Sequence, residues 1–159
     1  MAKASTDRKV DIAPDVYNCN SAHTFTYSFI LRNRGKRGQW TFREEFRTRC
    51  ESSPSSWSFE MIFHKVEANG KVFFPATLTR TDSAPNVVDV LVNPQIYDDF
   101  GNIFTSSWVL KGEGVRGGDV LEKALEGYFS NIEEGFCFIL ELRVQIFIFV
   151  TSCHSPSTV

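Results

Sequence analysis

Apolar and polar residues alternate along much of this chain, and the alternation is clearest between residues 86 and 105. Every second residue from Val88 to Val92 is valine, and the positions between them include Asp89. A period of two is the pattern of a β-strand that buries one side. Pro94 is expected to interrupt the hydrogen-bond ladder, and Gly101 can take the positive φ of a turn before the next strand.

Similar units recur on both sides of this one, separated by polar or glycine-containing turns. The Asn69-Gly70 pair is a strong hairpin signal between two of them. The predicted strands cover residues 25–31, 40–49, 57–63, 72–79, 87–93, 103–110 and 135–144. The strand that begins at Trp57 has four large apolar residues on one face, so it is predicted to lie in the middle of a sheet.

Two segments late in the chain depart from the alternation. Residues 111–118 contain four glycines and are predicted to form a loop. This loop lacks the Gly-Lys-Ser/Thr ending of a phosphate-binding loop, so it does not predict a nucleotide site. Asp119 can cap a short helix near residues 119–126, whose apolar residues have helical spacing, and Gly127 is expected to end it.

These elements predict an all-β fold, an antiparallel β-sandwich of seven or eight strands with one short helix. A barrel is the second choice. A length of 159 residues fits one domain with a proper core. We expect a flexible lead-in over residues 1–22, the sandwich domain over residues 23–146 and a C-terminal tail over residues 147–159.

Composition and charge argue against several classes of partner. The chain has 15 Phe and 2 Met, which favours sheet over helix, and a net charge of −2. That charge provides no overall field to attract nucleic acid or an acidic membrane. Basic residues cluster between Arg32 and Arg49, but aromatic residues are not regularly interleaved among them. We therefore expect a solvated loop and edge strand there, with no nucleic-acid or membrane partner.

The cysteines and the N-terminus bear on the compartment. Cys19, Cys50, Cys137 and Cys153 are widely spaced and form no CxxC pair, so a zinc site is not predicted. The N-terminal residues lack the apolar core of a signal peptide. The longest apolar run, residues 144–150, is too short to span a bilayer. These features predict free thiols and a cytoplasmic or nuclear location.

Residues for catalysis or metal binding are sparse in the sequence. No two of the three histidines stand at a metal-ligand spacing. Cys153 and His154 are adjacent, but neighbours in a tail are not oriented as a thiolate and its base. The consecutive acids Asp98 and Asp99 are typical of a turn. The sequence therefore predicts no catalytic residue, no metal site and no cofactor.

Aromatic residues give a stronger signal than ionisable ones. Phe73, Tyr97 and Trp108 lie near predicted strand ends beside polar loops, where they could line a surface groove or belong to the core or its rim. A groove beside an exposed strand edge lets an extended peptide pair its backbone and place alternate side chains in pockets.

The order of these motifs resembles the MATH domain, the sandwich shared with TRAF C-terminal domains and the speckle-type POZ (BTB) adaptors. Residues 25–33 resemble the aromatic-x-Trp-x-Ile-x-Asn opening strand of that family, with Phe29 at the usual tryptophan. Trp57 would be the tryptophan of the Trp-x-Leu strand. Residues 88–101 are similar to the strand that ends in Ile-Leu-x-x-x-Gly, and residues 118–125 fall where the family has its Trp-Gly-x-x-x-Phe-Ile element.

The resemblance covers about residues 23–146 and implies an eight-stranded antiparallel sandwich that binds short linear peptides in a shallow groove. The implied peptide-binding residues are Phe73, Val92, Trp108, Asp119 and Val120. Val120 replaces the tryptophan of the adaptor group and Val92 replaces an aromatic residue, so that group's serine-rich peptide preference is not expected here. The BTB module and the coiled coil that relatives carry are not recognised in this sequence, and a truncated gene product is one hypothesis.

Two classes of function follow from these features. The first is a protein-interaction module that binds short linear peptides and acts as a substrate-recruiting adaptor in ubiquitination. The alternative is a carbohydrate- or ligand-binding sandwich of another family, in which exposed Trp and Tyr stack on sugar rings. An enzyme is a third reading, and no constellation of residues in the sequence supports it.

Overall fold

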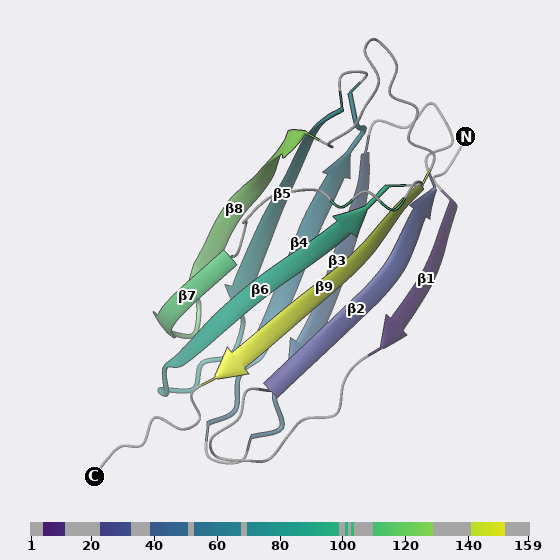
Figure 1. The fold of residues 1–159 in the computed structure, drawn as a ribbon. Helices are drawn as coiled ribbons and strands as arrows, with labels where there is room; N and C mark the ends of the chain where they lie inside the picture. Colours follow the sequence, from purple (N-terminus) through teal and green to yellow (C-terminus); the bar gives the residue numbers. More distant parts are fainter. Residues whose placement is uncertain are drawn as a thin grey trace.

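A computed structural model of the chain contains two β-sheets packed face to face (Figure 1). It describes residues 5–11, 23–32, 39–50, 53–67, 70–98, 101, 103, 110–128 and 141–151. Within these ranges the secondary structure consists of strands, with no helix. The strands are β1 (Ser5–Asp11), β2 (His23–Arg32), β3 (Gln39–Arg47), β4 (Ser56–His64), β5 (Lys71–Arg80), β6 (Val88–Tyr97), β7 (Leu110–Val115), β8 (Val120–Tyr128) and β9 (Glu141–Thr151).

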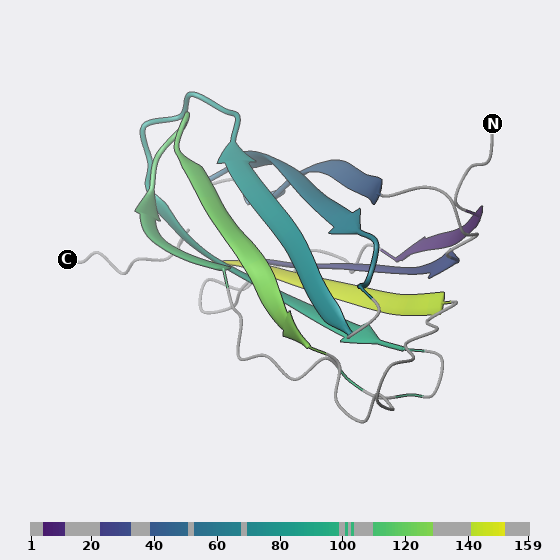
Figure 2. The ribbon, with the colours of Figure 1, turned by 90° about the horizontal axis from the view of Figure 1, so that it is seen from above.

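The two sheets contain five and four of these strands. The first has the order β1-β2-β9-β6-β7 and the second the order β3-β4-β5-β8, and neighbouring strands pair antiparallel throughout the described residues. Figure 2 shows the two layers nearly edge-on, with β3, β4 and β5 above β2, β9 and β6. The predicted all-β antiparallel sandwich is therefore confirmed.

Aromatic side chains join the two layers. In β2 every second residue from His23 is buried, which is the predicted alternation. Phe29 of β2 stacks on Phe42 of β3 in the other sheet, with ring centroids 4.6 Å apart. Phe25 and Phe46 make a similar contact between the sheets, with ring centroids 4.7 Å apart. The phenylalanine-rich composition thus reflects an interior filled by rings from both inner faces.

The predicted helix near residues 119–126 is wrong, because this segment is strand β8. It pairs with β5 over its whole length, from Val120 opposite Thr79 to Tyr128 opposite Lys71. The spacing of its apolar residues also fits a strand that buries Leu125. Pairing with a neighbouring strand thus overrides a local preference that was compatible with a helix.

The predicted loop over residues 111–118 is correct only in its last part. Residues Leu110–Val115 form strand β7, and a turn follows between Arg116 and Asp119. Gly112 has a packing role, because a Cβ there would lie 2.6 Å from the Cδ1 atom of Leu121. Glycine therefore lets β8 approach β7 closely.

Pro94 does not end its strand as predicted. It is buried inside β6, opposite Ile146 of β9. Within the described residues the pairing of β6 with β7 reaches Val92, opposite Leu110, and does not include the proline. A residue without an N–H group is tolerated where hydrogen bonding to one neighbour is absent.

The ends of the chain contain more strand than the composition indicated. β1 lies inside the segment expected to be a flexible lead-in, and it pairs with β2. β9 begins within the predicted last strand and continues to Thr151, into the expected tail. In the region of the strand predicted at residues 103–110, Ile103 forms an isolated bridge with Tyr97, and residues 104–109 lie outside the described part.

Candidate functional site

Exposed apolar side chains mark one face of the four-stranded sheet. The described residues include five large hydrophobic side chains that are exposed, and three of them lie on β5 and β8. These are Phe73, Val120 and Tyr128, with exposed fractions of 41%, 52% and 55%. The register of β5 and β8 places all three on the outer face of the sheet, because they alternate with buried residues such as Phe74 and Leu125.

The two exposed aromatic residues lie close together at one end of this strand pair. Phe73 lies opposite Glu126, so Tyr128 is its diagonal neighbour. The ring of Phe73 also contacts the ring of His64 on β4, with centroids 5.7 Å apart. Val120 lies at the other end, six residues from Glu126, which is about 20 Å along an extended strand. We call this surface, Phe73 with residues 120–128, the β8 edge face.

Among the described strands, β8 is the last of its sheet, with β5 on one side. Every second residue of such a strand directs its N–H and C=O groups away from the sheet. β7 belongs to the five-stranded sheet, where it pairs with β6. It approaches β8 near the turn that joins the two strands, and the rest of β8 extends away from β7 (Figure 1). Among the described strands, none pairs with this second edge of β8, and the edge lies beside an exposed apolar surface.

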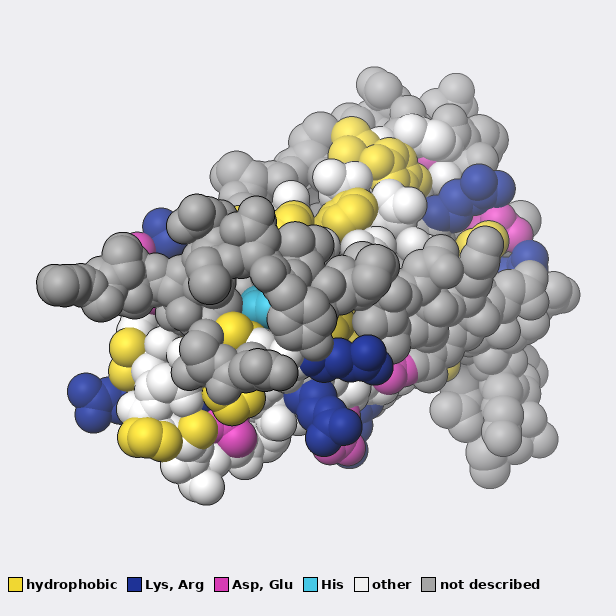
Figure 3. Space-filling view, turned by 90° about the horizontal axis from the view of Figure 1, so that it is seen from below, with side chains coloured by type: hydrophobic (Ala, Val, Ile, Leu, Met, Phe, Trp, Pro, Cys, Tyr) yellow, Lys and Arg dark blue, Asp and Glu magenta, His cyan; other side chains and the backbone are white. Residues whose placement is uncertain are grey.

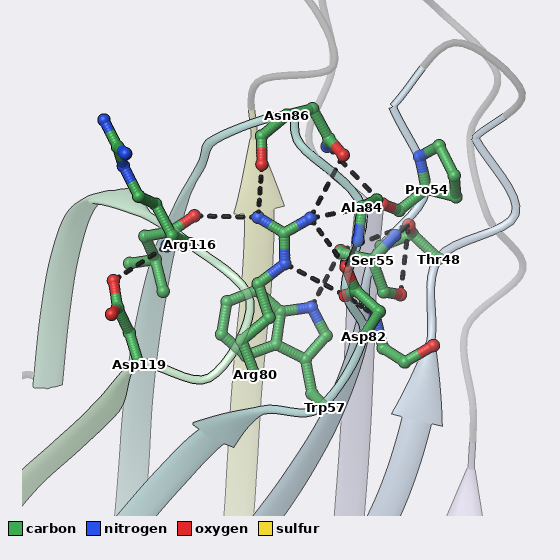
Figure 4. Close-up of polar contacts among 12 residues, drawn as sticks. Thr48, Pro54, Ser55, Trp57, Arg80, Asp82, Ala84, Asn86, Arg116 and Asp119 are labelled. Carbon is green, nitrogen blue, oxygen red and sulfur yellow. Dashed lines mark hydrogen bonds and ion pairs between the residues drawn. The ribbon is translucent and has the colours of Figure 1, made fainter.

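A buried arginine fixes the turn that begins β8. Arg80, at the end of β5, is 0% exposed. Its guanidinium donates hydrogen bonds to the carbonyl oxygens of Asn86, at 2.7 Å, and Val115, at 2.8 Å. It also forms a two-point ion pair with Asp82, at 2.9 and 3.0 Å (Figure 4). The side chain thus ties the end of β5 to the start of β6 and the end of β7.

The backbone of Arg80 holds the same turn directly. Its N–H donates to the carbonyl of Asp119 at 3.0 Å, and its carbonyl accepts from the N–H of Gly118 at 2.8 Å. Gly118 has a φ of 91°. A Cβ at Gly117 would lie 2.1 Å from the carbonyl oxygen of Asp82, so this position accepts only glycine without movement of the backbone. The turn is therefore packed tightly against the Arg80–Asp82 pair.

The carboxylate of Asp82 completes this network. Burial raises its pKa, but the hydrogen bonds that it accepts from Arg80 and from the backbone N–H groups of Ser56 and Ala84 outweigh burial. The net result is a pKa below the usual value of an aspartate. Asp82 is therefore held in its ionised form, as the partner of a fully buried cation.

The structure brings together only part of the predicted peptide-binding set. Phe73 and Val120 share the β8 edge face but lie at its two ends. Asp119 precedes β8, and its Oδ2 accepts a hydrogen bond of 2.8 Å from the N–H of Arg116 within the turn. Val92 is fully buried between the sheets, away from this face. Trp108 lies outside the described residues.

Two residues of this region, Tyr128 and Arg80, are absent from the predicted set. A helix that ends at Gly127 gives Tyr128 no role, whereas a strand with alternating faces exposes it. Arg80 follows four inward-facing residues of β5 at a period of two, so the pattern itself places a charge in the core. A charged residue on the buried face of a strand, with Asp82 two residues later, is a signal for a buried ion pair.

Other surfaces of the described residues show weaker signs of a binding site. Figure 3 views the end at which β2 and β6 begin, and there the exposed apolar side chains lie in separate groups among charged ones. No cluster of three metal-ligating side chains occurs in the described ranges. The same ranges contain no helix of the length and apolar character needed to cross a membrane.

Comparison with known proteins gives no family for this chain. Neither a protein-family model nor a curated protein sequence matches it. The candidate site therefore rests on the residues and geometry of this molecule.

Proposed function

We propose that this protein is an interaction module that binds an extended peptide along the β8 edge face. This proposal is carried by one coincidence: an edge of β8 that pairs with no described strand lies beside Phe73, Val120 and Tyr128, three of the five exposed large hydrophobic side chains in the described residues. Isolated exposed hydrophobics are common, but a group that follows one sheet edge is typical of a binding surface.

In the proposed mode the peptide adds a strand to β8. Backbone hydrogen bonds to the open edge supply affinity that does not depend on the peptide sequence. Side chains on alternate positions of the peptide lie over the outer face and contact Tyr128 and Phe73 at one end and Val120 at the other. The Arg80–Asp82 pair contributes by keeping the turn before Val120 in place.

The MATH resemblance belongs to the same proposal. Strands β2 to β9 make up eight strands of an antiparallel sandwich, the number that the resemblance implies, and β1 is additional. We propose that the domain acts as an adaptor that recruits peptide-bearing proteins, in the cytoplasm or nucleus, for ubiquitination. The buried thiol of Cys50 is compatible with such a reducing compartment.

The test is selection from a random library of nine-residue peptides displayed on phage, followed by affinity measurement with synthetic peptides. We expect selected peptides to bind the wild-type protein with micromolar dissociation constants. Replacement of Phe73 by Ala should weaken binding at least about fivefold, because an aromatic contact is lost. N-methylation of alternate peptide amides should abolish binding, since it removes the backbone hydrogen bonds of an added strand.

A matched control is available in the chain. Ile103 is 42% exposed and forms a bridge with Tyr97 at the end of β6, in the other sheet, so Ile103→Ala removes a similarly exposed apolar side chain outside β5 and β8. This variant should bind selected peptides like the wild type. Selection that enriches no peptide, or equal losses in both variants, would overturn the proposed site. A glycan array that gives specific binding would favour the carbohydrate-binding alternative instead.

A further inference from the structure

We infer that the peptide recognised at the β8 edge face carries basic residues at two positions that alternate with apolar ones. This inference rests on the proposed function and adds the chemistry of the ligand. The outer positions of β8 read Val120, Glu122, Ala124, Glu126 and Tyr128, so each of two acidic side chains stands between apolar or small residues.

The two glutamates are accessible and are not satisfied by neighbouring charges. Glu122 and Glu126 are both exposed, and no ion pair joins either of them to another described residue. Their partners across the strand pair are Thr77 and Phe73, which carry no charge. The carboxylates are therefore available to a ligand.

The charges on the neighbouring strands β4 and β5 differ from the two glutamates. Glu60 of β4 forms an ion pair with Arg43 of β3, so its charge is already matched. Lys71 is the basic residue of β5 on this face, opposite Tyr128 at the end of the strand pair. The outer face of the β5–β8 pair thus has more acidic than basic side chains, with the acids on the edge strand.

The spacing of side chains between paired strands predicts which residue types the peptide carries at each position. Directly opposed side chains of paired strands lie on the same face about 5 Å apart, and opposite charges there attract. An added strand therefore places basic side chains opposite Glu122 and Glu126 and apolar side chains opposite Val120, Ala124 and Tyr128. Because the two acids are placed symmetrically along β8, the same pattern results whether the peptide runs parallel or antiparallel.

Charged residues on an edge strand also have a protective role, since they discourage edge-to-edge aggregation. Protection against aggregation needs charged side chains of either sign on the edge strand. Recognition of a basic peptide needs negatively charged side chains there. Exchange of both glutamates for lysine keeps the edge charged and therefore separates the two explanations.

The experiment measures fluorescence anisotropy with labelled peptides of nine residues, the length of β8. The first peptide has leucine at its first and ninth positions, valine at the fifth, lysine at the third and seventh, and threonine elsewhere. Two others have glutamine or glutamate in place of both lysines, and a fourth has the composition of the first with its lysines adjacent. We expect the alternating lysine peptide to bind about tenfold more tightly than the glutamine peptide, and increasing salt to reduce the difference.

The double variant Glu122→Lys/Glu126→Lys should reverse the order, so that the glutamate peptide binds best. The variant Glu45→Lys/Glu113→Lys makes the same change of net charge on β3 and β7 and should keep the wild-type order. Circular dichroism and the thermal midpoint show whether each variant is folded, and a misfolded double variant is replaced by Glu122→Gln/Glu126→Gln, which should remove the preference.

The outcomes separate this inference from the proposed function. If all the peptides bind with equal affinity and N-methylation of their amides abolishes binding, the preference for basic residues is overturned. Peptide binding at the edge of β8 then still stands. Equal binding of the alternating and adjacent lysine peptides would reduce the preference to general electrostatic attraction and overturn the assigned pattern. If no peptide from this set or from the library binds, both proposals fail.

Discussion

At one end of the sandwich, the buried side chain of Arg80 forms an ion pair with Asp82. Arg80 is completely buried, and a buried cation is stable only when it is paired and hydrogen-bonded. Asp82 supplies the charge, the carbonyl groups of Asn86 and Val115 accept from Nη1, and the side-chain Oδ1 of Asn86 accepts from Nη2 at 3.2 Å. The network stabilises the association of several strand ends, including the turn before β8.

Replacement of Asp82 by Asn should destabilise the fold by about 3 kcal/mol, because it leaves the buried Arg80 without a counter-charge. The pKa of Asp82 is lowered in the folded state, so its ionised form stabilises the fold above the pKa of the unfolded chain, about 3.9. This stabilisation is lost as the pH falls through the lower, folded pKa. The free energy of unfolding, measured by urea titration from pH 7 to pH 2, should therefore depend less on pH in Asp82→Asn than in the wild type.

Glu113→Gln is the control for this prediction. Glu113 is exposed and its ion pair with Lys111 lies on the surface, so the substitution should change the stability little. If Asp82→Asn were as stable as the wild type at pH 7, the buried pair would not have the role assigned to it.

At the scale of elements, the position of a strand in its sheet decides what it can do. β4 and β9 each have neighbours on both sides, whereas β8 has β5 alone among the described strands. The inner face of β8 still belongs to the core through Leu125. In the described part of the chain the strand is thus held by one neighbour and its own buried face, and no described strand pairs with its second edge.

Residue-resolved hydrogen exchange should reveal this asymmetry. We expect alternate amides of β8 to exchange quickly, because those that face its second edge have no partner among the described strands, whereas amides in the middle of β4 and β9 exchange slowly. A bound peptide should protect the fast amides of β8. Uniformly slow exchange along β8 in the free protein would show that its edge is covered.

At the scale of the whole molecule, the sandwich depends on pairings between distant parts of the chain. β2 pairs with β9, and the ion pair between Arg32 and Glu141 joins residues that are 109 positions apart. The second sheet likewise brings β8 beside β5 after the chain has passed through the first sheet. The core cannot close until these pairings form.

Such a topology should fold slowly, with refolding times of milliseconds to seconds. Stopped-flow fluorescence after dilution from urea can follow this process, since the indole of Trp57 is buried in the native core. Refolding that is complete within tens of microseconds would contradict this expectation, because it would require contacts that are mainly local.

The sequence by itself determined the sandwich and most of its central strands. The alternation around Val88 and around Trp57 encodes which face is buried, and this depends on local side-chain order, which a sequence displays directly. Phe73 and Val120 were named through the family resemblance, and both side chains are exposed on the outer face of the second sheet, while their role in peptide binding stays a prediction.

Only the tertiary structure decided how the remaining segments are used. Residues 119–126 have a spacing that a helix and a strand both satisfy, and pairing with β5 selects the strand. Pro94 is tolerated in β6 because the described pairing with β7 does not reach it, which no local pattern reveals. The Arg80 network and the open edge of β8 also depend on which distant segments become neighbours. Local order therefore specifies the faces of the strands, whereas sheet order specifies the candidate site.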